Sequence, residues 1–485
     1  MIDAIPFNFY IAALPIFFVS LASLLILLLP SSLFKNQTLT FSLFSSVLLI
    51  SLGLVLYTYK TDSFLNGALL FDSLSLFGQS ILILTALIVT MLVKESYLST
   101  RFFSREVCSL YLLTLLGMMV IVSSADLITL FVGLELSSIG IYILSGYIFP
   151  DRMSVEGALK YLVLGSFATA FLLFGLGLLY ATTGILNLNE MSKMTLENED
   201  IWLKISLIFT LVGVSFKLAL FPFHKWAPDV YESAPTSITA LMATSVKVII
   251  VILIMRLGSG LSNVLEWSPI FLSLSALSMI GGNLLALIQT SMKRMLAFSS
   301  IAHSGYMAIA LCILQVSDLS HEVILFYLVG YVLTSLLAFG TLISLETAQH
   351  RNIQLQDLQG LFKSSPLAAF SLSVAMFSFA GIPPTVGFFS KFFVFNAALQ
   401  QNLYSLVLIG VLGSVISLYY YLRVLVTIYM QKPMSESSLL PFHKSFLTKT
   451  ILCLACLFIL LFGTVFPDYI YSSLRKEVVV NDHSH

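Results

Sequence analysis

The sequence predicts an all-α polytopic membrane protein with about 14 transmembrane helices. Hydrophobic residues make up 58% of the 485 residues and charged residues only 10%, whereas soluble domains are about 25% charged. Apolar runs recur from Tyr10 to Phe466, and each bilayer-spanning helix needs roughly 20 such residues. Prolines interrupt two of the runs at comparable places. Together these observations place nearly the whole chain in a lipid bilayer.

Short polar joints separate the apolar runs, so the spans can be placed in order. The first run ends at Pro30 and lacks a basic leader and a small-residue cleavage pattern, so we expect it to be retained as a helix. The predicted spans are 10–30, 38–58, 73–93, 107–124, 126–149, 155–183, 201–235 with a break, 236–257, 268–290, 295–316, 322–346, 366–400 with a break, 403–430 and 446–466.

The two interrupted spans indicate an internal duplication. We predict three N-terminal helices over residues 1–106, a five-helix repeat over 107–257, a second repeat over 258–430, and a C-terminal helix with a short tail over 431–485. Because five is odd, the second repeat is expected to be inverted relative to the first. Inverted repeats with discontinuous helices are typical of secondary transporters. The alternative is that the prolines only bend packed helices.

Five ionisable residues lie inside these apolar spans: Glu135, Lys160, Lys217, Lys247 and Lys391. Placing one charge in hydrocarbon costs about 2.5 kcal/mol or more, so such residues usually face a cavity and carry function. Lysine suits a proton relay because loss of hydration favours proton release, and a nearby carboxylate favours proton retention. The alternative is one static ion pair with Glu135, the other lysines reaching toward the membrane surface.

The prolines at each break free backbone carbonyl groups beside a lysine. Pro222 leaves the carbonyl of Leu218 without its helical donor, immediately after Lys217. Pro383 and Pro384 free the carbonyls of Phe379 and Ala380, and Lys391 follows Pro384 by two helical turns on about the same face.

The remaining candidates differ in strength. Lys247 would lie about 18 Å into a helix that starts after Pro235, near the bilayer centre. His303 could pass protons, because neutral imidazole both donates and accepts, although a packing role explains it equally well. His224 is a weaker candidate beside the first break, and Lys160 comes early enough in its span to reach an interface.

Several classes of function are excluded by composition and motif. The chain has 24 basic and 24 acidic residues and thus no basic excess for nucleic acid. It contains no dinucleotide-binding glycine turn, phosphate loop, four-cysteine cluster or haem attachment pair. Its four cysteines lie in or beside apolar segments and are expected to be buried thiols. We therefore expect no cofactor and no metal site in this chain.

Lys and Arg in the connections predict the orientation. With the N-terminus outside, 13 fall in inner connections, Lys293 among them, and six in outer connections, Arg256 among them. Both termini are therefore expected on the outer side.

Two long motifs resemble the antiporter-like subunits of respiratory complex I, the proton-pumping NADH-quinone oxidoreductase. One runs from Lys217 through Leu-Ala-Leu-Phe-Pro-Phe-His-Lys-Trp-Ala-Pro-Asp-Val-Tyr-Glu-Ser-Ala to Pro235, and the other is Gly381-Ile-Pro-Pro-Thr-Val-Gly-Phe-Phe-Ser-Lys391. The resemblance covers about residues 107–430. Pro-Asp-Val-Tyr-Glu and the lysine at 391 are similar to the N-type subunits. M-type subunits carry glutamate there, and L-type subunits continue into a long C-terminal helix.

The resemblance implies a role for each matching residue. Glu135 would pair with Lys217 as a switch, Lys247 would pass the proton on near His303, Lys391 would be the terminal site, and Lys160 would tune the uptake side. The nearest alternative family is the multi-component sodium/proton antiporters, and a third interpretation is a scaffold that has lost transport.

The resemblance also implies the surroundings of the chain. NADH, FMN, iron–sulfur clusters and quinone would bind partner subunits. The neighbours would be membrane lipid, the K-type and M-type subunits and the long lateral helix of the L-type subunit. The setting would be a bacterial inner membrane.

Overall fold

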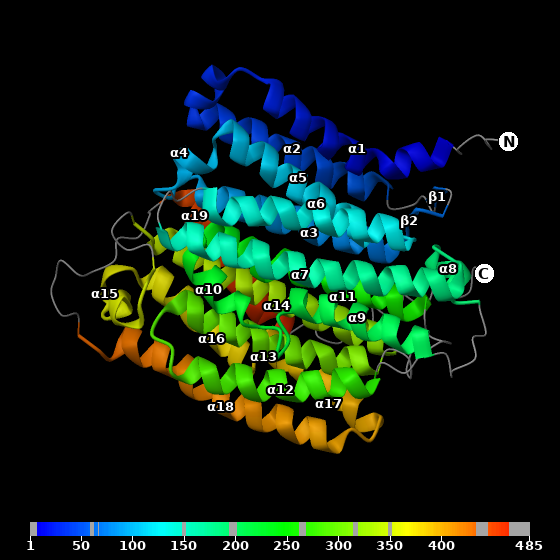
Figure 1. Ribbon diagram of the computed structural model, residues 1–485. Helices are drawn as coiled ribbons and strands as arrows, with labels where there is room; N and C mark the ends of the chain where they lie inside the picture. The colour runs from blue at the N-terminus through cyan, green and yellow to red at the C-terminus, as the bar shows by residue number, and fades with distance from the viewer. Residues whose placement is uncertain are drawn as a thin grey trace. The chain divides into compact units, whose positions relative to one another are not determined.

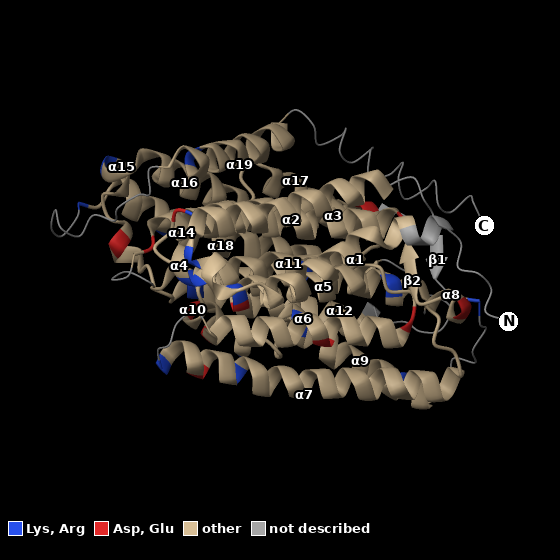
Figure 2. Cartoon of the chain, turned by 90° about the horizontal axis from the view of Figure 1, so that it is seen from above, with Lys and Arg blue, Asp and Glu red and all other residues tan. Residues whose placement is uncertain are grey.

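The computed structural model describes residues 7–58, 63–65, 67–147, 152–193, 201–260, 268–313, 319–347, 352–432 and 445–464. Within these ranges the chain forms 19 α-helices, two short 3-10 helices and one two-stranded antiparallel sheet. Charged residues occupy few positions along the helices (Figure 2). The predicted all-α membrane fold is confirmed.

Within the described residues, 13 helices are long and apolar enough to cross a membrane. The remaining predicted span, 366–400, is present as two shorter helices, α16 (Pro366–Ala380) and α17 (Val386–Gln400). The described helix ends lie within four residues of the predicted boundaries, apart from the short helices and strands in the connections. The tails 1–6 and 465–485 are outside the described residues. The predicted location of both termini on the outer side stays a prediction.

The chain divides into two compact units. Unit 1 comprises Met1–Thr90, Leu98–Lys217 and Ser245–Glu266, and unit 2 comprises Met91–Tyr97, Leu218–Thr244 and Trp267–His485. One of the borders between the units falls inside the first broken span, between Lys217 and Leu218. These units are defined by which segments pack together, whereas the predicted repeats are defined by the order of the helices along the chain. The predicted division at residues 107, 258 and 431 therefore stays a prediction.

Unit 1 is a bundle of long helices with a small sheet at one end. In Figure 1, α1, α2 and α5 lie side by side, and α6 follows α5 and packs on α7. The close approach of α5 and α6 depends on Gly117, because a Cβ there would lie 2.5 Å from the backbone nitrogen of Ser137. The elements are α1 (Phe7–Leu28), η1 (Ser31–Lys35), α2 (Gln37–Thr58), β1 (Ser63–Leu65), β2 (Leu69–Phe71), most of α3 (Ser73–Val93), α4 (Ser99–Phe102), α5 (Arg105–Val122), α6 (Leu127–Tyr147), α7 (Arg152–Thr183), α8 (Leu188–Met191), nearly all of α9 (Ile201–Leu218) and the second part of α11 (Thr236–Gly260).

Unit 2 is built around helix α13, in which every residue except Arg294 is buried. Helices α12, α13 and α18 are neighbours (Figure 1), and α14 packs against α16, α17 and α19. A Cβ at Gly282 would lie 2.7 Å from the backbone nitrogen of Ala302, so glycine sets the spacing of α12 and α13. The elements are α10 (Trp226–Ser233), the first part of α11, α12 (Ser268–Leu287), α13 (Met292–Cys312), α14 (Leu319–Leu345), η2 (Leu355–Leu358), α15 (Leu361–Ser364), α16, α17, α18 (Tyr404–Tyr429) and α19 (Phe446–Thr464).

Both predicted helix breaks are present. Helix α9 ends at Leu218, and Ala219 takes a left-handed conformation (φ 56°) before α10 begins at Trp226. Helix α16 ends at Ala380 and is followed by Gly381, whose φ of 80° glycine adopts without steric cost. The break is the fourth span of each predicted repeat, after α5, α6 and α7 in one and α12, α13 and α14 in the other. The inversion of the second repeat stays a prediction.

Candidate functional site

Three of the predicted lysines are buried. Lys217 is 4% exposed, Lys247 is 2% exposed and Lys391 is 5% exposed. The static alternative requires the lysines that do not pair with Glu135 to extend to the surface, and none of these three side chains does so. Glu135 is half-buried and Lys160 is exposed.

Lys217 is held by two hydroxyl groups of α6. Its Nζ donates to Ser138 Oγ at 2.7 Å and to Tyr142 Oη at 3.0 Å, and it lies 5.2 Å from the centre of the Tyr142 ring. Tyr142 reaches this position because Gly165 of α7 has no side chain: a Cβ there would overlap the tyrosine hydroxyl. The ammonium group is thus bound by groups that both accept and donate protons.

Glu135 lies on the same stripe of α6 as Ser138 and Tyr142, at i, i+3 and i+7. Its charge interacts electrostatically with Lys217. Among the described residues no hydrogen bond or ion pair joins the two side chains directly, and Glu135 Oε1 is buried without a hydrogen-bond partner. The predicted pairing is therefore an interaction across a gap, with the Lys217 ammonium held by hydroxyl groups.

Helix α11 carries Lys247 in its middle. The helix begins at Thr236, directly after Pro235, so the expected depth of Lys247 along the helix is confirmed. Two residues earlier, Ser245 exchanges a hydrogen bond of 3.0 Å with Thr85 of α3. This bond joins α11 to α3 inside unit 1, close to the lysine.

Lys391 lies on α17, and its side chain reaches back to the second break. Its Nζ donates to the freed carbonyls of Phe379, at 2.9 Å, and Ala380, at 3.2 Å. It also lies 5.0 Å from the centre of the Tyr306 ring. The contact agrees with the expectation drawn from Pro383 and Pro384. At the first break the freed carbonyl of Leu218 instead accepts from Ser304 Oγ at 2.8 Å.

His303 lies on α13 inside a cluster of tyrosines that sequence reasoning did not single out. Its Nδ1 shares a hydrogen bond of 2.7 Å with Tyr327 Oη, and its ring lies 5.8 Å from the Tyr306 ring and 5.5 Å from the Tyr331 ring. These three tyrosines are almost fully buried. They come from α13 and α14, and no local pattern in the sequence marks them as neighbours of one histidine.

The two weaker candidates occupy different surroundings. His224 is buried in the first break and stacks on Phe221, with ring centres 4.6 Å apart. Lys160 forms an exposed i, i+4 pair with Glu156 of α7 at 3.0 Å. Lys160 is thus at the surface of the chain, where α7 begins.

Three sequence expectations need correction. Arg256 was counted in an outer connection, but it lies within α11 and is 6% exposed. Lys293 was counted in an inner connection, but it is 2% exposed in the first turn of α13. Cys453 was expected to be buried and is exposed on α19. In the first two cases partners from distant parts of the chain bury the charge, which single-sequence reading does not reveal.

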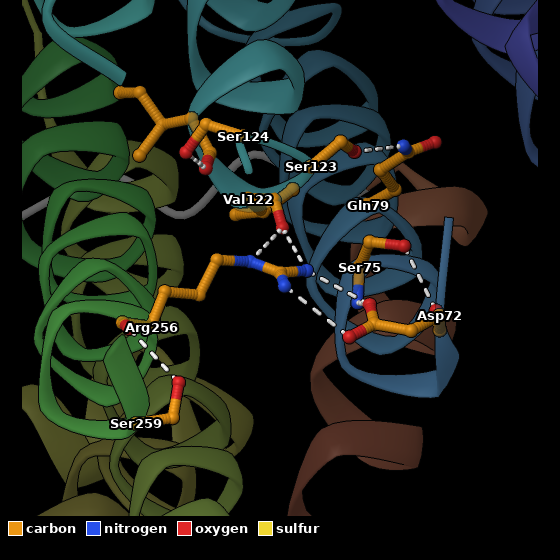
Figure 3. Close-up of polar contacts among 9 residues, drawn as sticks. Asp72, Ser75, Gln79, Val122, Ser123, Ser124, Arg256 and Ser259 are labelled. Atoms are coloured by element: carbon orange, nitrogen blue, oxygen red, sulfur yellow. Dashed lines mark hydrogen bonds and ion pairs between the residues drawn. The ribbon is translucent and has the colours of Figure 1, made fainter. Parts of the chain in front are cut away.

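Arg256 closes a polar cluster at one end of unit 1 (Figure 3). Its guanidinium group donates to both Asp72 oxygens, at 2.8 and 3.2 Å, and twice to the carbonyl of Val122, at 2.8 and 3.0 Å. Asp72 follows β2 directly and accepts from the backbone nitrogen of Ser75 in the first turn of α3. The cluster therefore ties α11 to the sheet, to α3 and to the end of α5.

The chemistry of these groups is proton exchange. Ammonium, imidazole, phenol and hydroxyl groups all donate protons, and each except ammonium also accepts them. No group of three or more His, Cys, Asp or Glu side chains suited to a metal ion occurs in the described part of the chain.

A family model and the sequences of known proteins match this chain and point to the same family. Residues 124–417 match the family described as NADH:quinone oxidoreductase/Mrp antiporter, transmembrane. NADH-quinone oxidoreductase subunit N 1 of Herpetosiphon aurantiacus is 39% identical over 434 residues, 87% of this chain and 88% of that protein. Subunit N 1 of Chloroherpeton thalassium is 36% identical over 96% of this chain and 97% of that protein.

Solved structures with the same fold are also known. A chain of respiratory complex I from Thermus thermophilus superposes with a TM-score of 0.81 and 31% identity, over 96% of this chain and 99% of that chain. A chain of the Mrp complex from Dietzia sp. has a TM-score of 0.81 at 19% identity, over 97% of both chains, which shows a common fold alone.

Proposed function

Because the chain belongs to the NADH:quinone oxidoreductase/Mrp antiporter transmembrane family, we propose that it is the proton-translocating N-type subunit of an NADH-quinone oxidoreductase. Relatives that carry the name subunit N cover most of the chain at 34–39% identity. They favour this assignment over the multi-component sodium/proton antiporters.

One observation carries the proton-translocating role: two lysines are buried at helix breaks, and no carboxylate of the described residues is in direct contact with either. Lys217 is bound by two hydroxyl groups, and Lys391 by two carbonyl groups and a tyrosine ring. A buried charge that lacks a direct counter-ion is costly, so small electrostatic changes decide whether the proton stays. A static ion pair would place a carboxylate against each ammonium group.

The residues then divide between the two units. In unit 1, the negative charge of Glu135 favours the protonated form of Lys217. When that charge is neutralised, Lys217 releases a proton through the Tyr142 or Ser138 hydroxyl group, which gives up its own proton as it accepts the new one, and Lys247 continues the relay. In unit 2, His303 and Lys391 carry the last steps, and the proton leaves from Lys391 toward the outer side.

Electron transfer takes place in partner subunits under this proposal. NADH, FMN, iron–sulfur clusters and quinone bind there, and this chain holds no cofactor. Its neighbours are the K-type and M-type subunits, the lateral helix of the L-type subunit and lipid. The membrane is the bacterial inner membrane, with both termini on the outer side and Lys160 near the uptake side.

The test compares Lys217→Ala with wild type in native membrane vesicles. NADH oxidation and NADH-driven proton uptake are followed together, and assembly is checked on a native gel. We expect an assembled complex whose proton uptake falls by about tenfold or more, because a positioned proton carrier contributes a factor of about 100 or more. Lys225→Ala is the matched control, since Lys225 is exposed in the same broken span.

Two outcomes would contradict the proposal. A normal proton yield per NADH in assembled Lys217→Ala complex would remove Lys217 from the relay. Unchanged NADH-driven activity with loss of sodium/proton exchange would assign the chain to the antiporters.

A further inference from the structure

A buried ion pair in unit 2 lies outside the set of residues used above. Lys293 Nζ is 4.0 Å from Glu346 Oε1, and both side chains are 3% exposed. Lys293 is in the first turn of α13, and Glu346 directly follows the last residue of α14. The two ionisable groups therefore meet where the ends of two buried helices come together.

Both partners are also bound to the junction of α10 and α11. Lys293 Nζ donates to the carbonyl of Ala234 at 2.9 Å, and Thr236 Oγ1 donates to Glu346 Oε1. Ala234 and Thr236 flank Pro235, the last proline of the first broken span. The pair is thus fixed to the segment that leads into the helix of Lys247.

The neighbouring residue of the same turn is partly exposed at the surface of the chain. Arg294 donates to Asp229 at 2.8 Å and to Glu232 at 3.1 Å, and its side chain is 33% exposed. Asp229 is 34% exposed and Glu232 is 18% exposed. One residue therefore separates a solvated ion-pair cluster from the buried pair, so protons have a short way in from this face.

In the other direction, hydroxyl groups lead along α13 toward His303. Ser300 follows Lys293 by seven residues, two turns or about 10.5 Å along the same helix face. Its Oγ accepts from Tyr331 Oη at 2.9 Å, and His303 lies one turn further, bonded to Tyr327. Water molecules can bridge the remaining gaps between such groups.

The geometry of the pair favours exchange over rigid support. At 4.0 Å the ammonium and carboxylate groups are at the limit of an ion pair, and each has a separate hydrogen-bond partner. Buried ion pairs often contribute little to stability relative to apolar residues of the same size.

We propose that Lys293 and Glu346 form a proton-loading site of unit 2 that takes protons from the face beside Arg294 and delivers them along α13 to His303. The inference rests on the proposed function, because it supplies the relay with its protons. One cycle is balanced as follows. A proton from water adds to the Glu346 carboxylate, and Lys293 releases its ammonium proton toward Ser300 and His303. The protonated Glu346 then returns its proton to the Lys293 amine, which restores the ion pair.

Two near-isosteric variants test the site. Glu346→Gln keeps an oxygen for Thr236 but cannot take up a proton, and Lys293→Arg keeps the positive charge but cannot release one. In vesicles we expect both assembled variants to lower NADH-driven proton uptake by about tenfold or more. Glu346→Asp should restore part of it, because a carboxylate returns. Lys225→Ala, the exposed-lysine control used above, should keep the wild-type proton yield.

Each outcome decides the matter. Proton yields at wild-type level in assembled Glu346→Gln and Lys293→Arg complexes would overturn the loading site. Failure of both variants to assemble would also overturn it, because the pair would then be structural. Lys217→Ala is measured alongside: if it loses proton uptake while the two variants keep it, only this inference fails, and if it also keeps proton uptake, the proposed function fails.

Discussion

Replacing Arg256 tests whether the polar cluster of Figure 3 fixes α11 in unit 1. The change Arg256→Met keeps most of the volume of the side chain and removes all four donated hydrogen bonds. It leaves the Val122 carbonyl without these donors and Asp72 without its cation. The Arg256 side chain is 7% exposed and the Asp72 side chain 23% exposed. After the change, water can therefore replace part of the lost hydrogen bonding of Asp72, but it does not reach the Val122 carbonyl through the space of the Arg256 side chain.

The expected cost is about 3 kcal/mol, the lower end of the range for breaking a buried ion pair, because Asp72 is partly hydrated. This corresponds to a factor of about 100 in the folding equilibrium. Asp72→Asn should cost less, since the amide oxygen still accepts from the Ser75 nitrogen and the Val122 carbonyl keeps both guanidinium bonds. Arg256→Lys should be intermediate, because one ammonium group cannot reproduce the two-pronged contact.

The assay is the temperature at which the solubilised complex loses this chain, followed on native gels. We expect the order wild type, Asp72→Asn, Arg256→Lys, Arg256→Met from most to least stable. A double variant with Arg256→Met and Asp72→Asn should be no less stable than Arg256→Met alone, because the unpaired carboxylate is gone. Equal stability of Arg256→Met and wild type would refute the reasoning, and so would an Asp72→Asn variant as unstable as Arg256→Met.

Two further predictions concern the Lys217 site. Glu135→Gln should impair NADH-driven proton uptake while Glu135→Asp keeps part of it, because only aspartate keeps the negative charge that favours protonated Lys217; equal uptake in both variants would count against the switch. Gly165→Ala should displace the Tyr142 ring, since the added Cβ would lie 2.6 Å from the Tyr142 ring carbon Cζ, and so lower proton uptake without loss of assembly; Gly177→Ala on the same helix, with open space at its Cβ, should leave uptake unchanged.

The broken spans were predictable because proline acts locally. Pro222 and Pro384 remove backbone donors wherever the chain carries them, which favours a break or a kink close to them. The position of Lys391 two turns after Pro384 likewise follows from helix geometry, and its ammonium group does bind the carbonyls that the prolines free.

The partners of the charged residues were not predictable in the same way. Ser138 and Tyr142 are 79 and 75 residues from Lys217, and sequence reading proposed Glu135 as the direct partner instead. A single sequence does not state which helices lie side by side, so it leaves the identity of each contact open. The same holds for the tyrosines around His303.

Hydrophobic length and proline chemistry are local properties, so the membrane class, the spans, the two breaks and the charges in apolar surroundings follow from the amino-acid sequence alone. Only the tertiary structure decided which charges are paired. It buried Lys293 against Glu346 and Arg256 against Asp72, 53 and 184 residues apart. The physical reason is that burial and counter-ions come from neighbouring helices, and neighbours are set by packing of the whole unit.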